Sequence, residues 1–320
     1  MGLGLSRLVT AVPIAFVFPG QGSQSVGMMA GFDGHAIVRR TFDEASAALG
    51  EDLWALVTDG PDDALNQTVN TQPVMLTAGV AVWRAWQAAG GVAPSIMAGH
   101  SLGEYTALVA AGALAFGDAV PLVRFRAQAM QEAVPAGVGA MAAILGLDAT
   151  SVAAVCSEAA QGQVVEPVNF NTPEQIVIAG HREAVERAIA VATERGAKRG
   201  VLLPVSAPFH SSLMKPAADR LAARLASVPF AVPAIPVVQN VDAQAKSDPD
   251  AIRAALGLQA ASPVRWVDTI QAFATRGMTQ VIECGPGRVL TGMSKRIDRS
   301  LKGYALDAGA DIDTTLAALA

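Results

Sequence analysis

The most constraining feature of the sequence is a serine enclosed by two glycines, between an expected strand and an expected helix. Gly99, Ser101 and Gly103 match the pattern G-x-S-x-G. The apolar residues 96–98 predict the end of a short buried strand, and the Ala- and Leu-rich residues 106–114 predict a helix. A serine at such a junction requires a sharp, strained turn, and the flanking glycines leave room for it. We therefore expect the Ser101 hydroxyl to project into a cleft at a helix N-terminus, as a candidate nucleophile.

Composition limits the classes of protein that fit. The chain has 320 residues, of which 52% are hydrophobic and 16% charged, so one large domain or two smaller ones can bury a sizeable core. The net charge of −5 argues against nucleic acid as the main ligand. No run of about 18 uncharged apolar residues predicts a membrane span. Cys156 and Cys284 lie in no metal-binding or redox pattern. We expect inert thiols in a reducing, cytoplasmic location, with no metal and no cofactor.

The first part of the chain predicts a buried strand, a glycine-rich loop and a series of helices. The apolar run 14–18 is typical of a strand covered on both faces. The loop 19–24 follows, either as a tight turn or as a loop whose N–H groups face a cleft; no P-loop lysine follows it. The periodicity predicts helices at 36–49, 62–69, 71–89 and 118–132.

Two arginines, Arg124 and Arg126, lie on the last of these helices. Residues two positions apart point to different sides of a helix, so at least one arginine could face inward. A buried arginine requires an anionic partner, which is a structural ion pair or a bound ligand. We expect Arg124 to be the exposed one.

The pattern changes at residue 136 and predicts an inserted small domain. Residues 136–205 contain, in order, expected strands and helices at 140–147, 149–161, 164–170, 175–180, 182–195 and 200–206. This βαββαβ order is ferredoxin-like. The larger domain then comprises 1–135 and 206–320, and the insertion forms one wall of a cleft.

The last part of the chain carries a histidine in a loop. His210 precedes an expected helix at 211–226, and the pattern alone fits either an exposed residue or a catalytic base. Further on we expect strands at 234–241 and 280–283, a loop at 259–265, and helices at 266–276 and 289–301.

Five segments, in this order and spacing, resemble the malonyl-CoA:acyl-carrier-protein transacylases. They are the run 18–24, the run 99–105, Arg126, the run 207–210 and the run 283–287. The resemblance covers roughly residues 14–300. It implies an α/β fold, with an α/β-hydrolase-like large subdomain and an inserted ferredoxin-like small subdomain, in agreement with the division above.

The resemblance also implies a role for each site residue. Ser101 would be the nucleophile and His210 its base, held by the main-chain carbonyl of Gln259. The backbone N–H groups of Gln21 and Leu102 would form the oxyanion hole. Arg126 would bind the free carboxylate of malonyl.

Further residues would line the substrate site by the same resemblance. Gln21, His100, Asn169 and Phe209 would join Arg126 there, and Asn171 lies in the same Asn-Phe-Asn run. Phe209 departs from many bacterial members, which carry a small polar residue at that position. This departure concerns the shape of the pocket and leaves the Ser-His pair intact.

The implied function is ping-pong transfer of malonyl from malonyl-CoA to the thiol of an acyl carrier protein, for fatty-acid synthesis, by a monomer. Alternatives remain: a malonyl acyltransferase serving a polyketide synthase, a serine hydrolase, and a non-catalytic binding subunit. Since carriers are usually acidic and this chain is too, docking requires a local basic patch. Candidates, which are equally well ordinary solvated charges, are Lys215, Arg265, Arg288, Lys295 and Arg296.

Overall fold

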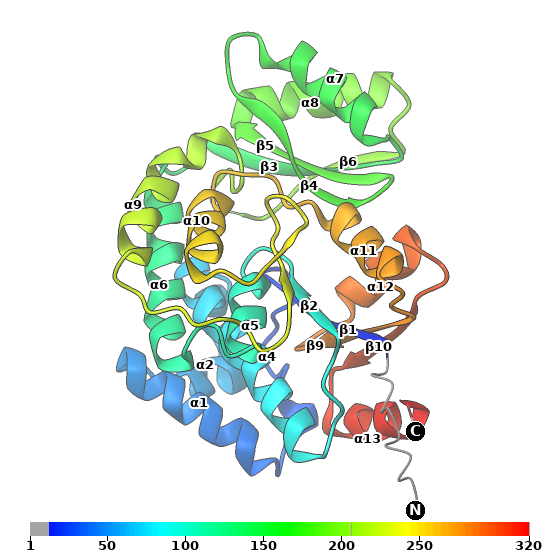
Figure 1. Ribbon diagram of the computed structural model, residues 1–320. Coiled ribbons are helices and arrows are strands. Elements are labelled where there is room, and N and C mark those ends of the chain that lie inside the picture. Colours follow the sequence, from blue (N-terminus) through cyan, green and yellow to red (C-terminus); the bar gives the residue numbers. More distant parts are fainter. Residues whose placement is uncertain (1–12, 206, 320) are drawn as a thin grey trace, which may run out of the picture.

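The computed structural model describes residues 13–205 and 207–319 and contains two sheets (Figure 1). The larger sheet has six strands in the order β10-β9-β1-β2-β7-β8. Its strands β10, β9, β1, β2 and β7 pair in parallel, and β8 pairs antiparallel with β7. The bounds are β1 Ile14–Phe18, β2 Ile96–Gly99, β7 Val237–Val238, β8 Ala245–Lys246, β9 Gln280–Cys284 and β10 Lys302–Leu306.

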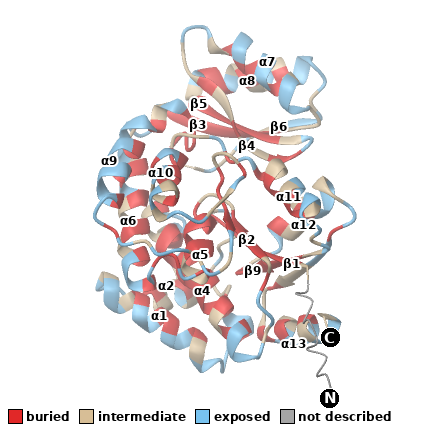
Figure 2. Ribbon diagram, in the orientation of Figure 1, coloured by how far each residue is buried: buried red, intermediate tan, exposed pale blue. Residues whose placement is uncertain are grey.

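Helices cover both faces of this sheet. They are α1 Ala36–Leu49, α2 Leu53–Asp59, α3 Asp62–Leu65, α4 Thr68–Ala88, α5 Gly103–Ala110, α6 Phe116–Glu132, α9 Lys215–Leu225, α10 Pro249–Gln259, α11 Trp266–Thr275, α12 Val289–Ile297 and α13 Gly309–Leu319. Short 3₁₀ turns lie at Ala30–Phe32 and Ser212–Met214. Exposed residues follow the outer sides of α1 and α9, whereas the central strands are buried (Figure 2).

The sequence of β1 explains why it lies at the centre. Its five residues are all buried. Ile14, Phe16 and Phe18 pack into the core formed with α4, α5 and α6, and Ala15 and Val17 pack against α11 and α12 on the other face. A strand with helices on both faces has no polar side, so an uninterrupted apolar run is the pattern that such a strand requires.

The smaller sheet is antiparallel, with the order β4-β5-β3-β6. Its strands are β3 Gly139–Leu145, β4 Val165–Thr172, β5 Gln175–His181 and β6 Arg199–Leu202, with the helices α7 Ala149–Ala160 and α8 Arg182–Glu194 between them. Successive side chains of β3 point to opposite faces of this sheet. Ala142 and Ile144 pack under α7 and α8, whereas Met141 and Ala143 face the main core. In Figure 1 the two helices lie on the side of this sheet away from the rest of the chain.

The α/β class expected from the sequence is confirmed, but several element bounds differ. The expected helix at 62–69 is α3, which ends at Leu65, since Thr68 already begins α4. The expected strand 234–241 shortens to β7, and 200–206 shortens to β6, with Ser206 outside the described residues. Gln259 ends helix α10 rather than lying in a loop.

None of the described helices is long and apolar enough to cross a bilayer. Among the described residues, no group of three His, Cys, Asp or Glu side chains could hold a metal ion.

Candidate active site

Ser101 lies in a strained turn between β2 and α5. Its φ is +52°, in the left-handed region that costs a residue with a side chain on the order of 1–3 kcal/mol. The chain turns so sharply that a Cβ on Gly99 would lie 1.8 Å from the carbonyl carbon of Gly103. The N–H of Ser101 donates to Oδ1 of Asn240 at 2.7 Å, and Nδ2 of Asn240 donates to the Gly99 carbonyl at 2.7 Å. Asn240 therefore joins the two sides of the turn.

We expect Gly99→Ala to lower the free energy of unfolding by about 3 kcal/mol or more, because the added methyl group meets backbone rather than a movable side chain. Urea unfolding followed by circular dichroism measures this. The matched control is Gly292→Ala inside α12, where a Cβ meets nothing within 4 Å. Alanine should leave stability unchanged or raise it there. Equal losses in both variants would mean that close approach at the turn is not what Gly99 provides.

The Ser101 hydroxyl contacts the imidazole of His210. Oγ lies 2.8 Å from Nε2, and Nδ1 lies 3.0 Å from the main-chain oxygen of Gln259. A carbonyl oxygen can only accept, so Nδ1 carries the proton and Nε2 is left as the acceptor for the Ser101 hydroxyl. This tautomer is the one that a general base needs.

The surroundings of His210 favour its neutral form. The residue is 4% exposed, and burial, followed by the Arg126 charge, lowers the pKa of His210 from 6.5 to about 3. The His210 backbone has φ +66°, and its N–H donates to the carbonyl of Ala260 at 3.1 Å. The end of α10 thus holds both the backbone and the ring of His210.

Arg126 is a buried arginine without a carboxylate partner. The residue is 1% exposed. Nη1 donates to Oε1 of Gln72 at 2.8 Å, and Nη2 donates to Oε1 of Gln259 at 3.0 Å and to Oγ of Ser101 at 3.2 Å. None of the ion pairs in the described part of the chain involves Arg126. The charges of Arg126 and the buried Glu104 interact, but no carboxylate bonds the guanidinium directly. Its free bonding capacity therefore suits an anionic ligand.

Arg124, on the same helix, occupies a different environment. It forms a two-pronged ion pair with Glu51, at 2.9 Å and 2.5 Å. As expected, Arg124 is the one of the two arginines that reaches the surface, although only 16% of its side chain is exposed. The aliphatic part of the side chain packs on the protein while the guanidinium meets a surface carboxylate.

The loop after β1 runs beside the serine turn. A Cβ on Gly103 would lie 2.0 Å from the Phe18 carbonyl, and one on Gly20 would lie 2.5 Å from the His100 carbonyl. Among the described residues, the backbone N–H groups of Gln21 and Leu102 have no hydrogen-bond acceptor. Both residues line the same cavity as Ser101, so their N–H groups are candidates to donate to a ligand oxygen.

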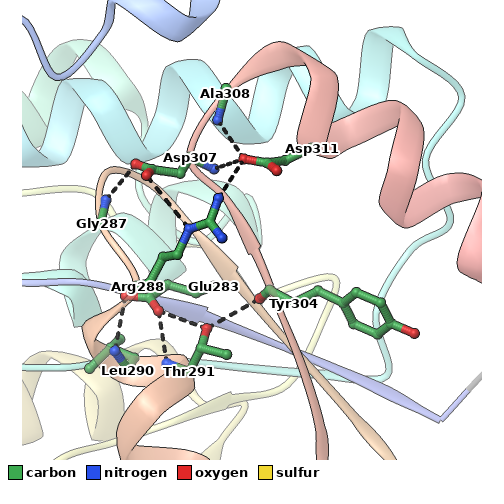
Figure 3. Close-up of polar contacts among 9 residues, drawn as sticks. All are labelled: Glu283, Gly287, Arg288, Leu290, Thr291, Tyr304, Asp307, Ala308 and Asp311. Carbon is green, nitrogen blue, oxygen red and sulfur yellow. Dashed lines mark hydrogen bonds and ion pairs between the residues drawn. The ribbon is translucent and has the colours of Figure 1, made fainter.

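A second glycine-rich loop supports this first loop from behind. A Cβ on Gly285 would lie 3.0 Å from the ring of Pro19. The N–H of Gly287 donates to Oδ1 of Asp307 at 2.8 Å, and the carboxylate of the buried Glu283 accepts two N–H groups from the first turn of α12 (Figure 3). These contacts fix the second glycine-rich loop, which lies between β9 and α12.

The remaining predicted residues line a small cavity over Ser101, with a volume of about 110 Å³. Met141 of β3 and Asn169 of β4 line it from the smaller sheet, and the loops after β1 and β2 line it with Gln21 and Ser101. Nε2 of His100 lies 2.8 Å from Oδ1 of Asn171. The cavity is lined by Gln21, Gln72, His100, Ser101, Leu102, Arg126, Met130, Met141, Asn169, Leu203, Val205, Phe209 and His210.

Three residues near the site were not predicted from the sequence. Gln72 accepts a hydrogen bond from Arg126, and Asn240 accepts one from the Ser101 N–H. Glu104 in turn accepts the backbone N–H of Asn240. Asn240 could have been found, since it follows a strand next to the one that leads to Ser101 and polar side chains at adjacent carboxyl ends converge. Gln72 and Glu104 lie within apolar helical stretches and gave no such signal.

The chain is similar to known acyl transferases over most of its length. The family model described as "Acyl transferase domain" matches residues 15–307. The malonyl CoA-acyl carrier protein transacylase of Escherichia coli (strain K12) is 58% identical over 294 residues, which cover 92% of this chain and 95% of that protein. The crystal structure of an acyl-carrier-protein S-malonyltransferase from Burkholderia pseudomallei 1710b is 62% identical, with a TM-score of 0.94, covering 95% of this chain and 99% of that one.

A further solved structure is a malonyl-transacylase in complex with a type II polyketide synthase acyl-carrier protein. It is 53% identical, with a TM-score of 0.94, and covers 95% of this chain and 99% of that one. Both the matched domain and the identities extend over nearly the whole chain. The chain therefore belongs to the acyl transferase family and, within it, to the malonyl CoA-acyl carrier protein transacylases.

Proposed function

We propose that this protein transfers malonyl from malonyl-CoA to the phosphopantetheine thiol of an acyl carrier protein, through a malonyl ester on Ser101. The observation that carries the proposal is the arrangement of three groups. The Ser101 hydroxyl lies 2.8 Å from the His210 imidazole, and the Arg126 guanidinium, which forms no ion pair with any described residue, reaches the same hydroxyl at 3.2 Å beside a small cavity. Family membership supports this substrate class.

In the first half-reaction, His210 Nε2 takes the Ser101 proton as Oγ attacks the thioester carbonyl. The Gln259 carbonyl stabilises the imidazolium through Nδ1–H. The N–H groups of Gln21 and Leu102 donate to the developing oxyanion, and each is expected to contribute on the order of 10²- to 10³-fold. Collapse of the intermediate expels the CoA thiolate, which takes the proton from Nε2.

The second half-reaction reverses these roles. The carrier thiol gives its proton to His210 and attacks the malonyl ester, and Ser101 regains its proton as the leaving group. Throughout, Arg126 holds the free carboxylate by a two-pronged contact. His100, Asn169 and Phe209 line the same cavity and limit its shape.

We propose that the two sheets belong to the subdomains implied by the resemblance. Residues 1–135 and 206–320 form the α/β-hydrolase-like part and 136–205 the ferredoxin-like part; residues 1–12, 206 and 320 of these ranges lie outside the described residues. The antiparallel order β4-β5-β3-β6, with α7 and α8 on one face, supports the second assignment. A cytoplasmic location and a monomeric state are part of the same proposal.

The carrier is fatty-acid type in our proposal, with a polyketide carrier as the second candidate because of the related complex. Three of the five candidate basic residues pair with neighbouring acids: Lys215 with Asp219, Arg265 with Asp268, and Arg288 with Asp307 and Asp311. Lys295 and Arg296 form no ion pair with any described residue and line a cleft beside the turn between β4 and β5. We propose this cleft as part of the carrier-docking surface.

A transfer assay tests the function. Purified protein is mixed with labelled malonyl-CoA and either a fatty-acid or a polyketide carrier bearing phosphopantetheine, and label on the carrier is followed by gel. We expect transfer to the fatty-acid carrier at the higher rate. Release of free malonate with no label on either carrier would indicate a hydrolase and contradict the proposal.

The pKa of His210 predicts a flat pH profile for the first half-reaction. Only the neutral imidazole accepts a proton, and a pKa of about 3 keeps it neutral well below the ordinary value of 6.5. We expect the single-turnover rate of malonyl-enzyme formation to stay constant from about pH 7 down to about pH 5, as measured by rapid quench. A tenfold fall per pH unit below 6.5 would show that His210 titrates normally.

A further inference from the structure

We propose that Glu104 is a positioning residue whose single carboxyl oxygen holds the nucleophile, the base and the substrate arginine in one arrangement. The inference rests on the proposed function, since it concerns the same site. Glu104 is the second residue of α5, and it contacts neither the cavity nor the reacting atoms. It acts through two other residues, Asn240 and Gln259.

Glu104 lies directly beneath the serine turn and is 1% exposed. Its Oε2 accepts the backbone N–H of Asn240 at 2.8 Å and Nε2 of Gln259 at 3.0 Å. Asn240 follows β7, and Gln259 ends α10. The Oε2 atom therefore connects both segments to α5, and no other hydrogen bond among the described residues joins Asn240 or Gln259 to that helix.

Each of the two residues held by Glu104 holds catalytic groups in turn. Asn240 accepts the N–H of Ser101 and so fixes the turn that projects Oγ. Gln259 makes three contacts with the site: its main-chain oxygen meets His210 Nδ1, its Oε1 accepts from Arg126, and its Nε2 also donates to the Ser101 carbonyl at 3.0 Å. Displacement of Gln259 therefore moves more than one catalytic group, and displacement of Asn240 moves the Ser101 turn.

The second carboxyl oxygen, Oε1, indicates that the length of the Glu104 side chain, rather than its charge, determines how Asn240 and Gln259 are held. Within the described chain, Oε1 of Glu104 is buried and has no hydrogen-bond partner. Burial raises the pKa of Glu104 to about 7, against the lowering effects of the Asn240 and Gln259 hydrogen bonds and of the Arg126 charge. A proton on Oε1 leaves Oε2 free to accept both bonds, so the neutral acid holds the same arrangement as the carboxylate.

Three substitutions separate the possible roles. Glu104→Gln keeps an acceptor oxygen at the same reach without the charge. Glu104→Asp keeps the charge but is one methylene too short to meet both donors, and Glu104→Ala removes the acceptor. Asp148→Ala is the control for general destabilisation, since it removes only the N-cap of α7 in the smaller sheet and should cost about 1 kcal/mol of stability.

The readout is single-turnover acylation by malonyl-CoA and by acetyl-CoA, which separates the maximal acylation rate from the apparent Kd. We expect Glu104→Ala and Glu104→Asp to lower the maximal rate for both acyl groups by about 100-fold with little change in Kd, because an error of about 1 Å in the reacting groups has that effect. Glu104→Gln should stay within about tenfold of wild type. Asp148→Ala should acylate at the wild-type rate.

Any ranking in which Glu104→Gln acylates no faster than Glu104→Asp overturns the proposal, including wild-type rates in both. This comparison also decides the matter if Glu104→Ala does not fold. Failure of the proposed function would look different, because the wild-type protein in the same experiment would then form no malonyl ester.

Discussion

We expect Ser101→Ala to abolish malonyl transfer, with a loss of at least about 10⁴-fold and no label from malonyl-CoA remaining on the protein. The reason is chemical. Ser101 is the only hydroxyl that contacts the His210 imidazole among the described residues, and it lies at the strained turn that aims it into the cavity. Label retained after denaturation, measured by scintillation counting, checks the result.

The control for this substitution is Ser157→Ala, an exposed serine on α7 that should label fully. Thermal unfolding shows whether both variants fold as the wild type does. Full transfer by folded Ser101→Ala would mean that the acyl group passes directly between the two thiols, and the ester intermediate would have to be abandoned.

Arg126→Ala should lower malonyl turnover by roughly 30- to 4000-fold, while acetyl turnover falls by less than about tenfold. Malonyl carries a carboxylate that loses its partner in the variant, and acetyl carries none. The Arg126 charge also lowers the pKa of His210, so its removal makes the imidazole a stronger base for either acyl group. The ratio of kcat/KM for malonyl-CoA and acetyl-CoA measures the change in specificity.

Arg124→Ala is the matched control, because it lies on the same helix and its ion pair is with Glu51 at the surface. It should leave the malonyl-to-acetyl ratio unchanged. If Arg126→Ala lowers both substrates equally, then the contacts of Arg126 with Gln72 and Gln259 serve the fold, and the carboxylate is recognised elsewhere.

Some elements of the fold could be predicted from sequence because their signal is local. Residues 14–18 form an uninterrupted apolar run, and 36–49 is an amphipathic stretch that ends at a glycine in the left-handed conformation; both elements have the expected bounds. The expected elements of 136–205 also occur in the expected order, with ends that differ by up to four residues. In each case the residues within and next to the element indicate where it begins and ends.

Other elements were missed or misplaced because neighbours or prolines decide them. Helix α10 begins with Asp248 as a capping residue and Pro249 in its first turn, a start signal that the sequence prediction overlooked. Strand β7 is two residues long rather than eight, and Pro236 precedes it without an N–H to pair. β10 and α13 were not predicted at all.

The site residues also divide into those with a local sequence signal and those without one. The G-x-S-x-G pattern points to Ser101 on physical grounds, whereas the role of His210 required the resemblance, since a lone loop histidine is ambiguous. Glu104, Asn240 and Gln72 escaped prediction, because their importance comes from contacts between residues 54 to 155 positions apart. Sequence patterns report periodicity along the chain and contain no direct record of such contacts.

The most direct test of the account is the intact mass of the protein after mixing with malonyl-CoA in the absence of carrier, with acetyl-CoA in parallel. We expect malonyl-CoA to add the mass of one malonyl group, peptide mapping to place that group on Ser101, and acetyl-CoA to add much less. An unchanged mass with malonyl-CoA, or a malonyl group on any residue other than Ser101, would contradict it.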